Sequence, residues 1–119
     1  MKSYRDLLVY QLSYEMAKLI YSRVTPKMPS NEQYGLISQM KRASTSVPLN
    51  IAEGYGKMDS NKELVRFLKM ARGSCCEMTV LIDFANDFEY ITKEEYKMLI
   101  GKYDEIGRML TGLIKQINF

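Results

Sequence analysis

The chain has 119 residues, a length that suits one domain with a core of its own. Hydrophobic residues make up 46% and charged residues 26%, as in soluble globular proteins, and histidine is absent. Without histidine there is no Ser–His or Cys–His nucleophile pair and no imidazole metal ligand, so we expect no enzyme, no metal site and no cofactor. No leader pattern or apolar run of about 18 residues is visible, which predicts a cytoplasmic protein.

The charges are unevenly distributed along the chain. Residues 41–72 hold seven basic and three acidic residues, whereas residues 73–107 hold three basic and eight acidic ones. Because the net charge is only +3, the total says little about nucleic acid. The distribution predicts a molecule that is electrically lopsided along its sequence.

Residues 4–24 are predicted to form the first helix, because apolar side chains recur at spacings of three and four. The predicted core-facing seam comprises Leu7, Tyr10, Tyr14, Ala17, Tyr21 and Val24. A second apolar edge comprises Val9, Leu12, Met16 and Leu19. Ser3 with Asp6 resembles a weak capping box before this helix, and "TPKMP" (25–29) interrupts the pattern after it.

Residues 31–53 are predicted to form the second helix, preceded by a Ser30–Gln33 capping box. Its apolar seam comprises Leu36, Met40, Ala43, Val47 and Ile51. Beside the seam runs a polar stripe of Gln39, Arg42, Ser46, Asn50 and Glu53. The stripe is either a solvated face or a contact surface, and its short polar side chains favour the second interpretation.

Pro48 lies inside this predicted helix. A proline there leaves the carbonyl of Ser44 without a helical donor and costs about 3 kcal/mol. We therefore expect the helix to kink at Val47–Pro48 or to restart with Pro48 in its first turn, which would shape the polar surface. Gly54 is predicted to end the helix with positive φ, inside the breaker "GYGKMD" (54–59).

Residues 61–89 are predicted to form the third helix, with Ser60 and Glu63 as its capping box. An unbroken seam comprises Leu64, Leu68, Ala71, Cys75, Met78, Ile82 and Ala85. Further apolar positions are Val65, Phe67, Met70, Cys76, Leu81, Phe84 and Phe88. So much apolar surface on one helix predicts either self-association or a wide core. The adjacent cysteines are interpreted as small buried side chains in a reducing compartment.

Residues 93–117 are predicted to form the fourth helix, after a Thr92–Glu95 capping box. The seam comprises Tyr96, Leu99, Tyr103, Ile106, Leu110, Leu113 and Ile117. No stretch alternates like a strand, and the connections are short. The sequence therefore predicts an all-α, antiparallel up-down-up-down four-helix bundle that forms one domain over residues 1–119.

The second and third helices are expected to place polar residues opposite one another. If the chain reverses around residue 57, Arg42 lies level with Gly73 and Ser46 lies level with Leu68, and Glu77 is within reach of Arg42. A glycine inside a helix costs about 1 kcal/mol, so Gly73 predicts a close approach by Arg42. We hypothesise a buried or interfacial polar network whose members, with the bend, serve assembly: Gln39, Arg42, Ser46, Pro48, Asn50, Glu53, Gly73, Ser74 and Glu77.

A basic stripe marks the start of the third helix. It comprises Lys57, Lys62, Arg66, Lys69 and Arg72, which are candidates for phosphate contact. The alternative is a solvated face partly paired with Glu63. No aromatic residue is interleaved as a stacking platform, so the stripe alone does not distinguish phosphate contact from a solvated face.

Two blocks of the sequence resemble a known family. "YGLISQMKRASTSVPLNIAEGYGK" (34–57) and "FLKMARGSCCE" (67–77) resemble the bacterial four-helix bundle family of 23S rRNA intervening-sequence proteins, to which diversity-generating retroelement accessory proteins are related. The opening "YRDLLVYQLSYEMAKLIY" looks like the first helix of that family. The matching positions are Leu36, Gln39, Arg42, Ala43, Ser46, Val47, Pro48, Asn50, Ile51, Ala52, Glu53, Gly54, Ala71, Gly73, Ser74 and Glu77.

The resemblance implies an antiparallel four-helix bundle that assembles into a ring-like homopentamer, has no catalytic residues and associates with nucleic acid. The leading hypothesis is a non-enzymatic, homo-oligomeric binding or scaffold module whose partner is RNA, DNA or a nucleic-acid-handling protein. No membrane or small-molecule partner is expected. The alternative is a purely structural oligomer, in which the basic start of the third helix faces an acidic segment of a neighbour (Asp83, Asp87 and Glu89).

Overall fold

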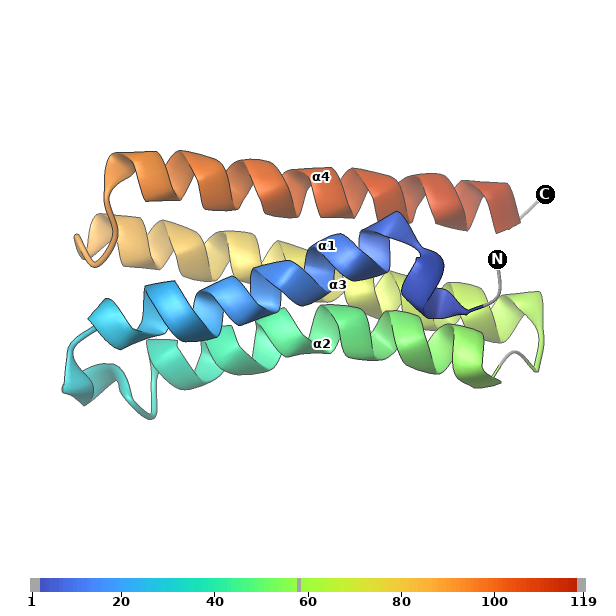
Figure 1. The fold of residues 1–119 in the computed structure, drawn as a ribbon, viewed down its shortest axis with the longest axis horizontal. Helices are drawn as coiled ribbons and strands as arrows, with labels where there is room; N and C mark the ends of the chain where they lie inside the picture. Colours follow the sequence, from blue (N-terminus) through green and yellow to red (C-terminus); the bar gives the residue numbers. More distant parts are fainter. Residues whose placement is uncertain (1–2, 58, 118–119) are drawn as a thin grey trace.

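The computed structural model describes residues 3–57 and 59–117 as an antiparallel four-helix bundle about 44 Å long. Its helices are α1 (Leu8–Leu19), α2 (Leu36–Lys57), α3 (Asn61–Asp87) and α4 (Lys93–Ile117). Consecutive helices run in opposite directions, as Figure 1 shows. The most extensive packing is between α2 and α3 and between α3 and α4, while α1 contacts both α2 and α4. The predicted fold class is confirmed.

The starts of α3 and α4 follow the predicted caps. Thr92 and Glu95 form a reciprocal capping box, because the Thr92 amide donates to Glu95 Oε1 at 2.8 Å and the Glu95 amide donates to Thr92 Oγ1 at 3.1 Å. At α3, Ser60 Oγ accepts from the amide of Glu63 at 3.1 Å. Both caps satisfy amides that have no partner within the helix.

The predicted Ser30–Gln33 box does not start α2. Ser30 opens a short 3₁₀ turn, Ser30–Glu32, and α2 begins only at Leu36. The side chain that caps α2 is Glu32, whose Oε1 accepts from the Leu36 amide at 3.2 Å. A carboxylate is favoured at this position because it faces the positive end of the helix dipole. The predicted start at residue 31 was therefore wrong.

The first helix is shorter than the predicted 4–24. The Ser3–Asp6 box caps a 3₁₀ turn, Tyr4–Asp6, and the extended backbone of Leu7 (ψ 128°) delays α1 until Leu8. Beyond Leu19 the chain continues as a π-helical turn, Ile20–Val24. Thr25 Oγ1 donates to the carbonyl of Ile20 at 3.1 Å.

The face that α1 turns to the core also differs from the prediction. Val9, Met16 and Ile20 are buried, whereas Tyr14 and Tyr21 are 48% and 44% exposed. The inner face is shared between the two predicted edges, because Ala17 and Val24 of the predicted seam are buried as well. Ser13 is also fully buried, and its hydroxyl donates to the carbonyl of Tyr10 at 2.9 Å. Only the part of the tyrosine-bearing edge at Tyr14 and Tyr21 faces outward.

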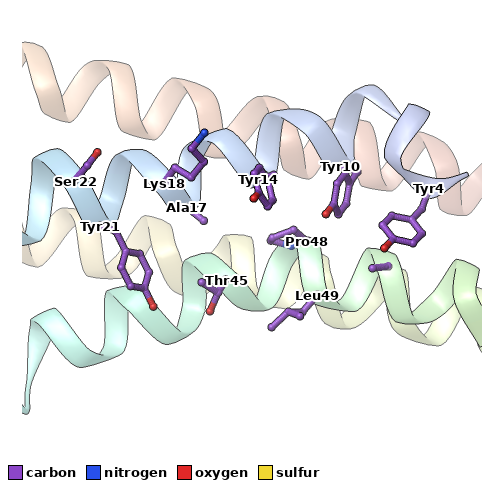
Figure 2. Close-up of a pocket in the computed structure, with 11 residues that line it drawn as sticks. Tyr4, Tyr10, Tyr14, Ala17, Lys18, Tyr21, Ser22, Thr45, Pro48 and Leu49 are labelled. Carbon is purple, nitrogen blue, oxygen red and sulfur yellow. The ribbon is translucent and has the colours of Figure 1, made fainter.

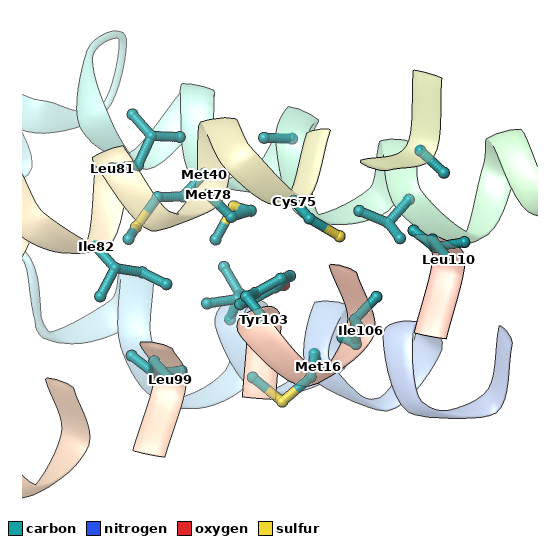
Figure 3. Packing of buried hydrophobic residues seen from close by; sticks show 14 of the residues in the cluster. Met16, Met40, Cys75, Met78, Leu81, Ile82, Leu99, Tyr103, Ile106 and Leu110 are labelled. Atoms are coloured by element: carbon teal, nitrogen blue, oxygen red, sulfur yellow. The ribbon is translucent and has the colours of Figure 1, made fainter. Parts of the chain in front are cut away.

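Every predicted seam residue of α2 and α3 is buried. Figure 3 shows side chains of α3 and α4 meeting in the core, with Met16 of α1 beside them. In α4, Tyr103 is 1% exposed, and its hydroxyl has no hydrogen-bond partner among the described residues. Burial raises the pKa of Tyr103 far above its usual value. Among the buried side chains of residues 3–57 and 59–117, this hydroxyl is the one polar atom without a hydrogen-bond partner.

The end of α3 is a left-handed turn at a residue that is not glycine. The helix ends at Asp87 instead of the predicted 89, and Glu89 has φ 62°. The amides of Glu89 and Tyr90 donate to the carbonyls of Asn86 (3.0 Å) and Ala85 (2.8 Å). This is the Schellman pattern, which normally places glycine where Glu89 lies.

Candidate functional site

Part of the predicted polar stripe forms a hydrogen-bonded cluster between α2 and α3. Ser46 Oγ and Ser74 Oγ are 2.8 Å apart, and Asn50 Nδ2 donates to Ser46 Oγ at 3.0 Å. The register is therefore not the predicted one, which placed Ser46 level with Leu68. The error arises because α2 continues to Lys57, so that the chain reverses nearer residue 60. Met58, in the predicted breaker, lies outside the described residues.

The predicted contact between Arg42 and Glu77 is present, as a salt bridge between Arg42 Nη2 and Glu77 Oε2. However, the two side chains are 62% and 36% exposed, so the pair is not buried within the chain. An exposed ion pair contributes about 1 kcal/mol or less to stability. A place at a subunit interface stays a prediction.

The other members of the stripe lie outside this cluster. Gln39 is exposed in the first turn of α2, and Glu53 is exposed near its end. Glu53 Oε2 lies 3.7 Å from Lys57 Nζ, one turn further along α2. The structure therefore joins Arg42 to Glu77 and joins Ser46 to Ser74 and Asn50, whereas no hydrogen bond or ion pair links Gln39 or Glu53 to these residues.

Gly54 and Gly73, the two glycines singled out in the sequence, differ from the predictions in how closely other residues approach them. Nothing lies within 4 Å of a Cβ built on Gly73, so the predicted close approach by Arg42 was wrong. Gly54 is buried inside α2, and a Cβ there would lie 2.9 Å from Phe67 Cβ and 3.1 Å from Leu64 Cδ1. No glycine has positive φ. Gly54 is therefore a point of close helix packing and does not terminate the helix.

Pro48 does not interrupt α2, which continues through it as one helix, so the predicted restart was wrong. Pro48 follows Ser46 by two residues, or about 200° around the helix. It therefore lies on the other side of α2, where it is buried near α1. The tertiary contacts of a buried proline compensate for its missing hydrogen bond, and Pro48 has no direct part in the polar cluster.

A concave apolar surface follows the line between α1 and α2, and sequence reasoning missed it. This α1/α2 groove has a volume of about 690 Å³. It is lined mainly by Tyr4, Tyr10, Tyr14, Tyr21, Pro48 and Leu49 (Figure 2). Burial is the main cause that raises the pKa of Tyr10. The outward recurrence of tyrosine on α1 was the available signal, but those residues were assigned to the core.

Two lysines lie beside the groove. Lys41 Nζ is 4.9 Å from the ring centre of Tyr21, and Lys18 Nζ is 5.7 Å from that of Tyr14. Lys18 also lies 3.6 Å from Glu15 Oε1. The half of the groove that contains Tyr14 and Tyr21 thus carries positive charge at its edge.

A convex apolar surface lies on the outer side of α3. This α3 ridge comprises Met70, Gly73, Val80, Phe84 and Phe88. The four side chains larger than glycine are 46%, 53%, 48% and 52% exposed. The prediction of surplus apolar surface on this helix is confirmed at Met70, Phe84 and Phe88, whereas Val65, Phe67 and Leu81 are buried in the core. Val80 was not among the predicted positions.

The basic stripe is partly neutralised within the chain. Arg66 donates to both carboxylate oxygens of Glu63, at 2.9 and 3.1 Å, and this hydrogen bonding lowers the pKa of Glu63. Arg72 Nη1 donates to Thr111 Oγ1 at 3.2 Å. Among the described residues, Lys62 and Lys69 are exposed and have no ion-pair partner. These two lysines are the best placed for an external anion.

The cysteines do not behave as a pair. Cys75 is buried, and desolvation raises the pKa of its thiol to about 12. Cys76 is exposed, so the expectation that both are buried was wrong for this residue. The two face different directions because consecutive helical residues are separated by about 100°.

Two other classes of site are a metal centre and a membrane-spanning helix. Residues 3–57 and 59–117 contain no group of three or more cysteine, aspartate or glutamate side chains that could hold a metal ion. Over the same residues, no helix has both the length and the apolarity that crossing a bilayer requires. The features that remain are the α1/α2 groove, the α3 ridge, the polar cluster and the basic stripe.

The fold and these surfaces define an all-α protein of the antiparallel four-helix bundle class. The sequence profile described as "23S rRNA-intervening sequence protein" matches residues 5–112, and the chain belongs to this family. The predicted membership is thereby confirmed, while the relation to retroelement accessory proteins stays a prediction.

A solved structure shares this fold. It is the crystal structure of a protein with unknown function from the S23 ribosomal protein family of Bacteroides thetaiotaomicron VPI-5482. The TM-score is 0.82 at 25% sequence identity, and the match covers 91% of this chain and 96% of that one. No curated protein matches the chain. The comparisons thus place the chain in a family of unknown function.

Proposed function

We propose that this protein is a non-enzymatic, homo-oligomeric helical-bundle scaffold that associates with nucleic acid or with a nucleic-acid-handling protein. The α3 ridge is the observation that carries the proposal. Its exposed residues lie along one side of a helix whose opposite side is already buried, at spacings of three, seven, four and four residues, and Glu77 occupies the position between Gly73 and Val80. Apolar side chains arranged in this way are typical of a helix packed on two sides.

Self-association is supported by the cost of leaving the ridge in water. Phe84 and Phe88 are about half exposed and stack on each other, with ring centres 5.8 Å apart. Removing apolar surface from water yields roughly 25 cal/mol per Å², so covering these rings stabilises an assembly. The five-subunit ring implied by the resemblance is the expected state.

Nucleic-acid association is supported by the basic stripe and by the words that describe the family, which name an intervening sequence of 23S rRNA. Lys62 and Lys69 lie on the same side of α3, two turns apart, and are free to contact phosphates. A ring of identical subunits would repeat these two lysines in every copy. Binding would then depend steeply on salt, because each phosphate contact releases counterions.

The oligomer is tested by light scattering after size exclusion. We expect the wild type to elute as an oligomer and Phe84→Glu to elute as a monomer with unchanged helix content. Met98→Glu is the matched control, because Met98 is a 40% exposed apolar residue on α4, outside the ridge and the groove. A monomeric wild type at high protein concentration would refute self-association.

Nucleic-acid binding is tested by fluorescence anisotropy with a short labelled RNA hairpin at several salt concentrations. The Lys62→Gln/Lys69→Gln variant should weaken binding and reduce the slope of log K against log salt by about 0.7–0.9 for each lost contact. The control is Lys93→Gln/Lys97→Gln, which removes the same charge from α4. Equal effects of the two variants would mean that the basic stripe is not the binding surface.

A purely structural oligomer is the second candidate. It is favoured by the pairing of Arg66 with Glu63 and of Lys57 with Glu53, which leaves less positive charge for a ligand. In this case the charges serve subunit docking, and the wild type binds no RNA even at low salt while remaining oligomeric. The two experiments above therefore separate the candidates.

A further inference from the structure

The α1/α2 groove and the α3 ridge lie on different sides of the molecule. Gly73, in the middle of the ridge, is two residues from buried Ala71 and from buried Cys75, which places the ridge opposite the core. The groove lies on the outer side of α1 and α2 (Figure 2). One chain thus presents a concave and a convex apolar surface that cannot cover each other within that chain.

The two surfaces are both elongated along the bundle. From Tyr10 to Tyr21 the groove follows α1 and the π-helical turn for about 17 Å at 1.5 Å per residue, and Tyr4 of the preceding 3₁₀ turn lengthens it further. The ridge extends from Met70 to Phe88, about 27 Å by the same measure. An elongated ridge and an elongated groove are the two halves that helix packing requires.

Their charges are complementary at one end. Lys18 and Lys41 lie beside the groove near the end of α1 and the start of α2. Asp83 and Asp87 are exposed near the end of α3, next to Phe84 and Phe88 in sequence, and Asp83 also accepts a hydrogen bond from the Tyr96 hydroxyl at 2.7 Å. The α1–α2 and α3–α4 connections lie at the same end of the bundle (Figure 1). Opposite charges therefore face each other when two bundles point in the same direction.

We infer that the α3 ridge of one copy seats in the α1/α2 groove of the next copy, with both bundles pointing in the same direction. This inference rests on the proposed self-association and specifies its geometry. The contact joins two different surfaces, so it is heterologous, and a rotation about an axis along the bundles closes it into a ring. The open space at Gly73 allows the wall of the groove to approach the backbone of α3.

Mixing two disabled variants tests this arrangement. Leu49→Glu disables the groove, and Phe84→Glu disables the ridge; both positions are exposed, at 59% and 48%, so the bundle should fold. Each variant alone has one intact surface with no complement and should be monomeric. An equimolar mixture should form a one-to-one heterodimer, because one intact groove and one intact ridge remain. Tyr14→Asp and Val80→Asp form a second pair with the same expectation.

The other possible results of this mixing experiment overturn the inference. If Leu49→Glu remains oligomeric while Phe84→Glu is monomeric, ridges pack on ridges and the inference is overturned, although self-association stands. If the mixture stays monomeric, or if both variants remain oligomeric, the ridge and groove are not partners. A monomeric wild type overturns the proposed self-association itself, and the inference with it.

The direction of packing is tested by exchanging the charges. Lys18→Glu/Lys41→Glu should shift the assembly toward monomer, and adding Asp83→Lys/Asp87→Lys to the same chain should restore it. If the exchanged charges do not restore the assembly, the inference that neighbouring bundles point in the same direction is wrong. Circular dichroism on each variant verifies that the helices are retained.

Discussion

Gly54 and Gly73 are both inside long helices that pack on each other, yet one has no room and the other has nothing near it. A Cβ on Gly54 would lie 2.9 Å from Phe67 Cβ, whereas a Cβ on Gly73 would meet no atom within 4 Å. Glycine is costly in both helices. At Gly54 the close contact between α2 and α3 explains it. At Gly73 no contact within the described chain does, and the explanation we propose is a second copy.

The largest effect on stability is expected at Gly54, where neighbouring side chains already fill the space that an added side chain would need. Gly54→Val should lower the free energy of unfolding by about 2–3 kcal/mol, because Phe67 and Leu64 block the added atoms and the helices must separate. Gly56→Val is the control, since nothing lies within 4 Å of a Cβ there, and its effect should stay within about 0.5 kcal/mol. Urea unfolding measures both. Equal effects would contradict the close packing at Gly54.

The next largest effect on stability is expected at Glu89, which occupies a backbone position that favours glycine. Glu89 has φ 62°, a conformation that costs a residue with a side chain about 1 kcal/mol or more. Glu89→Gly should therefore stabilise the protein by about 1 kcal/mol, whereas Glu89→Ala should not. Thermal unfolding of the two variants separates the backbone effect from the loss of charge. A gain from alanine as large as that from glycine would show that charge is responsible.

Gly73→Ala sharpens the comparison most directly. In the Phe84→Glu background it should stabilise the bundle by about 0.5–1 kcal/mol, because alanine is the better helix former and nothing obstructs its methyl group. Gly101→Ala, equally unobstructed on α4, should do the same. With Phe84 intact, only Gly73→Ala should weaken the assembly, as read by light scattering against protein concentration. Identical assembly in both variants would leave Gly73 without a role in association.

The smallest effect is expected at the surface pair of Arg42 and Glu77. In the same monomeric background, a double-mutant cycle to alanine should give a coupling of about 0.5 kcal/mol, because both side chains are substantially exposed. The cycle is repeated at high salt, where the coupling should fall. A coupling several times larger would mean that the pair is shielded from water.

Much of the fold could be predicted, because period and caps are local properties. The seams of α2 and α3 follow from spacing, and the bounds of α4 follow from spacing together with its capping box. The inner face of the first helix followed only in part. Ala17 and Val24 are buried as predicted, but Ser13 counts as polar in any pattern, although it is buried with its hydroxyl bonded to the preceding turn. Tyrosine counts as apolar, although its ring and hydroxyl also suit a partly exposed position.

The candidate site was less predictable, because it depends on distances between helices. The Arg42–Glu77 contact tolerates an error of register, since both side chains are long. The short side chain of Ser46 does not tolerate such an error. Because α2 extends to Lys57, the residue opposite Ser46 is Ser74 and not the predicted Leu68. The α1/α2 groove arises from how two helices lie against each other, which no spacing within one helix encodes.

The groove also gives the protein an optical reporter. The chain has nine tyrosines and no tryptophan, and Tyr4, Tyr10, Tyr14 and Tyr21 line the groove. Its intrinsic fluorescence is therefore tyrosine emission, a large share of it from this one surface. Any molecule that fills the groove changes the polarity and quenching around these phenols, so occupancy can be followed by emission intensity without attaching a dye.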